Sequence, residues 1–246
     1  MQELVLIGIG TGNPDHLTLQ AVKALNSIDL ILIPRKGPDK SDLADLRLQI
    51  CAAVVTNVAT RIAQFDLPVR DAANPDYLAR VEDWHDAIAA LWASTIAAHP
   101  EAGRVALLVW GDPSLYDSTL RIAARLNPAP KITVIAGITS LQVLTAAHGI
   151  AVNDIGAAFV VTTGRQLRDG GWPAGVDTVV VMLDGECSFT RLAPDGVTIW
   201  WAAYVGMQNQ ILIAGALADV SAQIVATRAR ARADHGWIMD IYLLRR

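Results

Sequence analysis

The chain has 246 residues, of which 52% are hydrophobic and 18% charged, and its formal net charge at pH 7 is −4. A general nucleic-acid binder presents a basic face to the phosphates, so this charge balance argues against that class of protein. The composition fits a compact globular protein with a sheet that is buried on both faces.

Apolar runs of strand length alternate with helix-period segments through the first half of the chain. This β-α-β alternation predicts a parallel sheet with right-handed crossovers. In this first part the expected strands are 4–7, 30–33, 63–67 and 105–109, and the expected helices are 17–26, 42–54 and 75–98.

The second half of the chain is richer in strands, which short turns separate. This density predicts a mixed sheet with antiparallel pairs. The pattern restarts after Tyr116, so we expect a boundary at 113–118 and two domains, 1–115 and 116–246. After the boundary we expect a helix at 118–126, a strand at 131–135 and a helix at 140–147. The expected strands that follow are 159–163, 178–182, 198–205, 210–214 and 237–244, with one clear late helix at 216–232.

The cysteines, the first residues and one long uncharged stretch indicate the cellular compartment in which the protein is expected. Cys51 and Cys187 lie far apart without a metal-ligand spacing, so we expect no metal and two free thiols in a reducing cytoplasm. The start, Met1-Gln2-Glu3, lacks the basic region of a signal peptide. The uncharged stretch 198–218 is long enough to span a membrane, but the polar turn at its centre, 206–210, favours two strands. We therefore expect a cytoplasmic protein without a membrane or nucleic-acid partner.

A glycine-rich loop, Gly8-Ile9-Gly10-Thr11-Gly12-Asn13-Pro14, follows the first expected strand. Such glycines let the backbone turn and approach another surface or a ligand, and open α/β sheets bind ligands at the carboxyl ends of their strands. A dinucleotide fold would need glycine at Asn13 and an acidic residue after the second strand, which ends instead in Pro34-Arg35-Lys36. An NADP-dependent reductase, with Arg35 on the 2′-phosphate, remains an alternative.

Two more loops follow expected strands: Gly111-Asp112-Pro113-Ser114-Leu115-Tyr116 and Ala136-Gly137-Ile138-Thr139-Ser140. Taken alone, they read as an Asp-Pro turn and a helix N-cap. In this order, the three loops resemble the motifs of the tetrapyrrole methylase family, S-adenosylmethionine-dependent enzymes that methylate corrinoid and sirohaem precursors. The resemblance covers nearly the whole chain. It implies a class III methyltransferase fold of two α/β domains, with an N-terminal parallel sheet, a C-terminal mixed sheet and the cofactor in the trough between them.

The resemblance also implies S-adenosylmethionine as cofactor and S-adenosylhomocysteine as product. Asp112 offers it an acceptor, Thr139 and Ser140 offer small donors, and Leu115 and Met182 offer apolar walls. Carried over position by position, the cofactor contacts are Thr11, Trp110, Gly111, Asp112, Leu115, Thr139, Ser140, Met182, Tyr204, Val205 and Gly206. The chain departs from the family pattern at Asn13, commonly Asp, which puts a catalytic role for that position in doubt, and at Ala136, often Pro.

Three segments, 182–185, 200–215 and 235–246, resemble the branch that methylates precorrin-5 at C-1 and releases its acetyl group as acetate. Another acceptor within the family and a binding module without turnover remain alternatives, and the family is usually homodimeric. A polycarboxylate macrocycle needs cationic anchors, for which the candidates are Arg35, Lys36, Arg165 and Arg168. Deacetylation needs a base that activates water, for which the candidates are His16, Asp15, Tyr116, His148 and Glu186.

Overall fold

The computed structural model of the chain describes residues 1–35, 42–69 and 77–246. It divides into two compact units, Met1–Thr139 and Ser140–Arg246. This division comes later along the chain than the 113–118 expected from the sequence. The reason is the strand β5 (Lys131–Ile135), which pairs in parallel with β1 (Glu3–Gly8) and therefore belongs to the first sheet.

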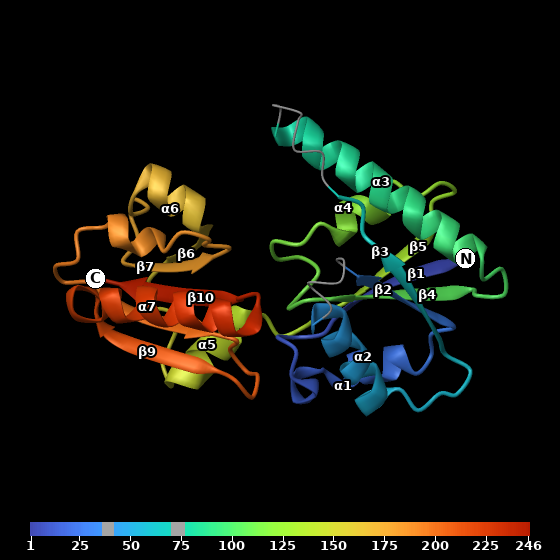
Figure 1. Cartoon of the computed structure of the whole chain (residues 1–246), viewed down its shortest axis with the longest axis horizontal. Coiled ribbons are helices and arrows are strands. Elements are labelled where there is room, and N and C mark those ends of the chain that lie inside the picture. Colours follow the sequence, from blue (N-terminus) through green and yellow to red (C-terminus); the bar gives the residue numbers. More distant parts are fainter. Residues whose placement is uncertain (36–41, 70–76) are drawn as a thin grey trace. The chain divides into compact units, whose positions relative to one another are not determined.

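The first unit contains a parallel five-stranded sheet of strand order β3-β2-β4-β1-β5 (Figure 1). Its other strands are β2 (Leu30–Arg35), β3 (Arg61–Asp66) and β4 (Arg104–Val109). The central strands β1, β2 and β4 are almost continuous runs of buried apolar residues, as expected when helices cover both faces of a parallel sheet. The predicted parallel sheet is confirmed.

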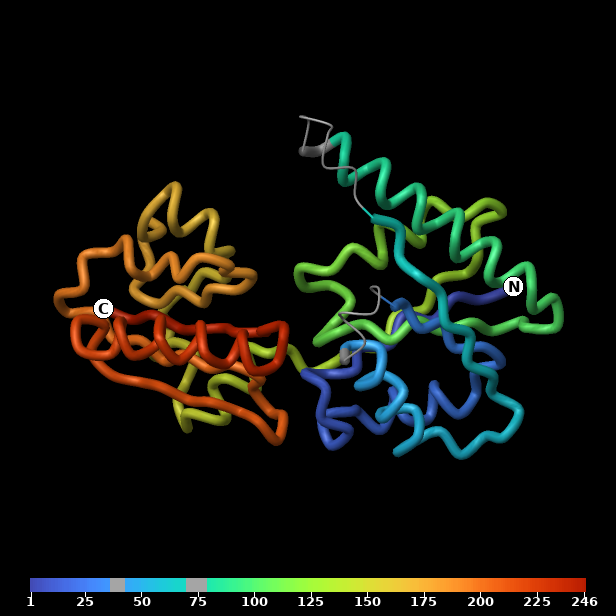
Figure 2. Tube along the Cα trace, viewed as in Figure 1, coloured from blue at the N-terminus to red at the C-terminus, as the bar shows by residue number. Residues whose placement is uncertain are grey.

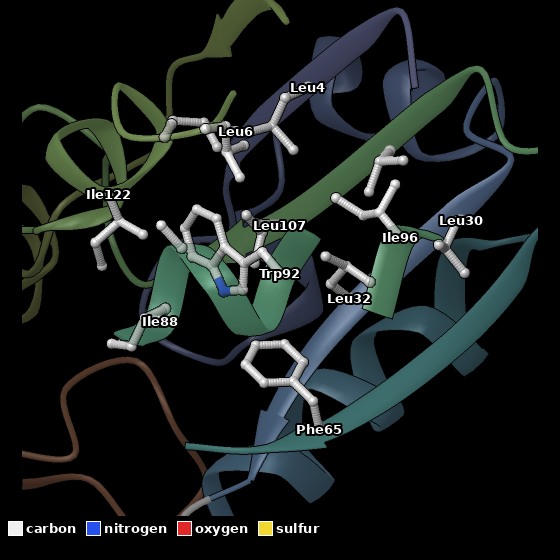
Figure 3. Close-up of a cluster of buried hydrophobic side chains, with 14 of the residues drawn as sticks. Leu4, Leu6, Leu30, Leu32, Phe65, Ile88, Trp92, Ile96, Leu107 and Ile122 are labelled. Atoms are coloured by element: carbon white, nitrogen blue, oxygen red, sulfur yellow. The ribbon is translucent and has the colours of Figure 1, made fainter. Parts of the chain in front are cut away.

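Helices cover both faces of this sheet, because alternate residues of each strand point to opposite sides. On one side, α1 (Leu19–Leu25) and α2 (Asp42–Val54) pack on a cluster that includes Val5 and Ile7. On the other, α3 (Tyr77–Ala97) and α4 (Thr119–Ala123) pack on the cluster drawn in Figure 3, which includes Leu4, Leu6 and Trp92. The expected start of the α3 helix, near residue 75, lies outside the described residues.

The connections create a topological switch point between β1 and β4, which are neighbours in the sheet. After β1 the chain passes to α1 on one face, whereas after β4 it passes to α4 on the other. The helices that follow these two strands therefore lie on opposite faces of the sheet. The carboxyl ends of strands at such a point are where open α/β sheets bind their ligands.

The second unit contains a mixed five-stranded sheet of order β6-β7-β10-β8-β9, as predicted (Figure 1). Figure 2 traces the path of the chain through this unit, from yellow-green to red. Only β6 and β7 pair in parallel, and β10 runs antiparallel to both β7 and β8. The elements are α5 (Ser140–His148), β6 (Phe159–Thr163), α6 (Gly164–Gly170), β7 (Thr178–Met182), a 3-10 turn (Ser188–Arg191), β8 (Thr198–Ala203), β9 (Ile211–Ala216), α7 (Leu217–His235) and β10 (Asp240–Arg245).

The uncharged stretch 198–218 forms β8 and β9, an antiparallel pair, so the interpretation as two strands is confirmed. No helix among the described residues is long and apolar enough to cross a membrane. The sequence reading missed α6, which is short and has a single large buried side chain, Leu167. Its start was nevertheless signalled by Thr163, whose hydroxyl accepts from the Gln166 N–H at 3.3 Å.

Candidate functional site

The three motif loops follow three adjacent strands of the first sheet. Loop 1 (9–16) follows β1, loop 2 (110–117) follows β4 and loop 3 (136–139) follows β5. Loops 1 and 2 are joined by backbone hydrogen bonds: the Gly111 N–H donates to the Gly10 carbonyl at 2.7 Å, and the Gly10 N–H donates to the Gly111 carbonyl at 3.3 Å. The motifs therefore meet at one edge of the sheet, as parallel strand ends must.

The motif glycines allow this meeting of backbones. A Cβ atom added to Gly8 would lie 2.6 Å from the Gly137 nitrogen and 2.8 Å from the Gly111 carbonyl oxygen. A Cβ atom on Gly137 would overlap the same carbonyl oxygen. The sequence left open whether these glycines approach a ligand or another surface. For Gly8 and Gly137, the surface is the neighbouring loop.

Asp112 ties loop 2 to loop 3. Its Oδ2 accepts a hydrogen bond from the Gly137 N–H at 2.8 Å, and its Oδ1 accepts from the N–H and hydroxyl of Ser114. Partial burial opposes ionisation, but the hydrogen bonds from Ser114 and Gly137 outweigh it and hold the pKa of Asp112 below its ordinary value. A carboxylate has further lone pairs, so Asp112 keeps acceptor capacity for a ligand while it organises the loops.

Thr11 and His16, which the sequence assigned to different roles, lie together in loop 1. The buried Thr11 hydroxyl is 3.1 Å from Nδ1 of His16. A Cβ atom on Gly10 would lie 2.7 Å from the Cβ of His16, so the histidine packs closely on the loop backbone. Asn13, the departure from the family pattern, accepts from the Asp15 N–H at 3.0 Å and caps the short 3-10 turn Pro14–His16.

Trp110, which opens loop 2, has a partner that the sequence reading did not single out. The guanidinium of Arg47, on α2, lies over the Trp110 ring with its Cζ 4.7 Å from the ring centroid. Arg47 is buried, with 9% of its surface exposed. No local pattern distinguishes it, because one arginine in a helix is usually a solvated charge.

In the second unit, Met182 ends β7 and Tyr204 follows β8. These strands lie on either side of β10 and are both antiparallel to it, so their carboxyl ends share one edge of the sheet. Leu183 and Tyr204 both have positive φ, 54° and 51°, which is unusual for non-glycine residues and worth a functional hypothesis. The Tyr204 side chain is buried and its hydroxyl donates to the Trp237 carbonyl at 2.6 Å. Val205 is buried as well, so Gly206 is the most accessible residue of 204–206.

The predicted cationic anchors differ in their surroundings. Arg35, at the end of β2, pairs with Asp66 at 3.1 Å, and Lys36 lies outside the described residues. Arg165 and Arg168 lie on α6 rather than on a loop. Arg168 pairs with Glu186 at 2.9 Å, so one anchor candidate and one base candidate neutralise each other.

The remaining base candidates are also placed. Asp15 and Tyr116 are exposed in loops 1 and 2, and partial burial raises the pKa of Tyr116. His148 lies at the end of α5, away from its first residue Ser140, and its Nε2 donates to the Trp201 carbonyl at 3.1 Å. Partial burial lowers the pKa of His148. Among the candidates in the first unit, only His16 combines partial burial with a side-chain hydrogen bond inside the loop edge.

The chain is therefore a two-unit α/β protein in which three motif loops meet at the carboxyl ends of β1, β4 and β5. The model of the protein family described as "Tetrapyrrole (Corrin/Porphyrin) Methylases" matches residues 3–221 of the chain. The chain belongs to this family, so the resemblance drawn from the three motifs is confirmed.

One individual relative is similar over the full length, and another is similar over about half of it. The chain is 46% identical to a precorrin-6A synthase [deacetylating] of Sinorhizobium sp, over 100% of this chain and 96% of the relative. It is 32% identical over 56% of its length to a precorrin-2 C(20)-methyltransferase of Sinorhizobium sp, of which the match covers 55%.

Solved structures agree with the fold. A cobalamin synthesis related protein (CobF) from Corynebacterium diphtheriae superposes with a TM-score of 0.84 and 41% identity, over 100% of this chain and 98% of that chain. A uroporphyrin-III C-methyl transferase from Thermus thermophilus, solved as a complex with S-adenosyl homocysteine, has a TM-score of 0.61 and 19% identity, over 98% and 91% of the two chains. The second likeness supports the fold alone.

Proposed function

We propose that the chain is an S-adenosylmethionine-dependent C-methyltransferase of corrin-ring synthesis, which methylates precorrin-5 at C-1 and releases the acetyl group as acetate to give precorrin-6A. The observation that carries this proposal is the 46% identity to a deacetylating precorrin-6A synthase over the whole chain. A cytoplasmic location and a homodimer come from the family resemblance alone, and we keep both as proposals.

The side chains of the three motif loops fit this cofactor. Thr11, Asp112 and Thr139 supply polar side chains beside the apolar Trp110 and Leu115, the mixture that ligand sites use to orient a small molecule. When bound, S-adenosylmethionine supplies a methyl group on a sulfonium. A sulfonium is already a good methyl donor, because a neutral thioether leaves. The protein's task is then to align the accepting carbon and to exclude water. We propose these five residues and Gly111 as the cofactor contacts of the first unit.

The other predicted contacts remain proposals that rest on the resemblance. In the second unit they are Ser140, Met182 and the backbone of 204–206, and the positive φ of Tyr204 supports the last of them. Arg35, Arg165 and Arg168 remain candidate anchors for the macrocycle. Asp66 pairs with Arg35, and Asp169 and Glu186 pair with Arg168, so a carboxylate of the macrocycle would compete with these groups.

The deacetylation step needs a base. Water adds to the acetyl carbonyl, the bond from C-1 to the acetyl carbon breaks, acetic acid leaves, and the electron pair left on C-1 takes the methyl group. We propose His16 as the base, because imidazole is the commonest general base near neutral pH and Thr11 orients its ring through the 3.1 Å hydrogen bond. His16→Asn should lower acetate release and methyl transfer together by about 100-fold or more, within the range for general bases, without weakening cofactor binding.

Turnover with labelled S-adenosylmethionine and purified precorrin-5 tests the function. One methyl group should enter the corrinoid for each acetate released. Methylation without acetate would place the chain elsewhere in the family, and tight cofactor binding without any turnover would favour another acceptor or a binding module. Calorimetry with S-adenosylhomocysteine and NADPH addresses the other class of enzyme, because only a reductase should bind NADPH tightly.

A further inference from the structure

Arg47 is a buried cation directly beneath loop 2. Its Nε donates to the Leu108 carbonyl at 3.1 Å and its Nη1 donates to the Leu43 carbonyl at 3.2 Å. The guanidinium covers the face of Trp110. These contacts fix the group at the carboxyl end of β4, next to the residues where loop 2 begins.

A missing donor on β2 explains why an arginine fits there. The pairing of β2 with β4 ends at Leu32 and Leu107. Continued by one residue, it would require the Leu108 carbonyl to accept from the backbone of Pro34, and proline has no N–H. Arg47 supplies that hydrogen bond from α2 instead.

The positive charge of Arg47 has no close anionic partner in the described ranges 1–35, 42–69 and 77–246 of the chain. Within the described residues, the charge of Asp117 favours the charged form of Arg47, but the two groups form no ion pair. The buried Arg228 of the second unit, by contrast, is 2.8 Å from an Asp240 oxygen. Burial accordingly lowers the pKa of Arg47 to about 10. Buried charges are normally paired. Toward the described residues, Arg47 donates through Nε and Nη1, which is part of its set of five N–H donors.

We propose that Arg47 is an anchor for a carboxylate that binds at the loop edge beneath Trp110. This inference rests on the proposed function, because that function supplies two carboxylate-bearing molecules. One source is the amino-acid end of the cofactor, and the other is an acidic side chain of the macrocycle. A guanidinium pairs well with a carboxylate in both cases, and it would repel the sulfonium itself. If the carboxylate belongs to the cofactor, Arg47 also determines that the amino-acid end of the cofactor faces α2.

The test combines calorimetry with kinetics on the full chain. S-adenosylhomocysteine carries the carboxylate, whereas 5′-methylthioadenosine has the same nucleoside and thioether without it. If the cofactor is the source, Arg47→Met should weaken S-adenosylhomocysteine binding by about 10- to 100-fold, the loss expected for a charge-assisted hydrogen bond, and leave methylthioadenosine binding unchanged. If the macrocycle is the source, both affinities stay unchanged and the KM for precorrin-5 rises by a similar factor.

Arg47→Lys keeps the charge and should recover part of the lost affinity; it also serves as the test variant if Arg47→Met does not fold. Arg104→Met is the matched control, because Arg104 lies at the other end of β4 and pairs with Glu3. An equal loss for both nucleosides would overturn the proposal, since it would mean that Arg47 only supports Trp110. Unchanged affinities together with an unchanged KM would overturn it as well. Absence of turnover on precorrin-5, with selective loss of S-adenosylhomocysteine affinity, would refute the proposed acceptor and leave the anchor standing.

Discussion

Replacing Gly137 by alanine places a methyl group inside the contact of three loops. Gly137 does not need a positive φ, so the cost is steric. The new Cβ would overlap the Gly111 carbonyl oxygen and lie 2.8 Å from Gly8 backbone atoms. Overpacking typically costs 1–3 kcal/mol. Both neighbours are backbone and are held by β4 and β1, so they cannot rotate aside as a side chain would, and we expect a loss of about 3 kcal/mol or more.

The assay is urea unfolding followed by circular dichroism, together with S-adenosylhomocysteine calorimetry on the folded variant. Gly170→Ala is the control, because a Cβ atom there meets nothing within 4 Å and should change the free energy of unfolding by less than about 1 kcal/mol. We expect Gly137→Ala to lose both stability and affinity. A variant within about 0.5 kcal/mol of the parent, with unchanged affinity, would refute the idea that the glycines are needed for contact between the loops.

Three further changes test other parts of the chain. Hydrogen bonds, foremost from Thr133, lower the pKa of Glu3 from 4.5 to about 2. The ionised Glu3 therefore contributes its full stabilisation of the folded state above pH 4.5, and this contribution is lost as the pH falls through 2. In denaturant titrations, the destabilisation caused by Glu3→Gln should shrink over that pH window. Asp240→Asn leaves the buried Arg228 without its ion pair and should cost about 3–5 kcal/mol; a loss below about 1 kcal/mol would show that neutral acceptors suffice. Asp112→Ala should weaken S-adenosylhomocysteine binding by about 1–3 kcal/mol, and unchanged affinity by calorimetry would remove it from the site.

The first sheet was predictable because strands buried on both faces have continuous apolar sequences. Runs such as Leu4–Ile7 and Val105–Val109 are apolar without alternation, and the structure confirms them as central strands. The strand at 131–135 was also expected, but its sheet was not. Strand pairing depends on contacts far apart in sequence, which periodicity does not report, so the division between the units moved to Thr139.

The candidate site was predictable in its location and less so in its contacts. Parallel topology alone brings the three loop motifs to one edge. The use of Gly8 and Gly137 to contact each other's loops became clear only with their neighbours in place. Arg47 was not predicted because its hydrogen bond to Leu108 takes the place of one that Pro34, a residue of a different element, cannot donate. A missing N–H on one strand and an arginine on the following helix form a signal only when the register is known.

The position of β10 in the second sheet has a consequence for the order in which the protein forms during synthesis. All five strands of the first sheet are complete by Ile135, so that sheet can close while later residues are still being added. The second sheet has no such freedom, because β10 (Asp240–Arg245) occupies its centre and bonds to both β7 and β8. Until those residues are synthesised, β7 and β8 each have an unpaired edge, and unpaired strand edges favour pairing with other chains. The second unit is thus the part of the newborn protein most exposed to misassembly.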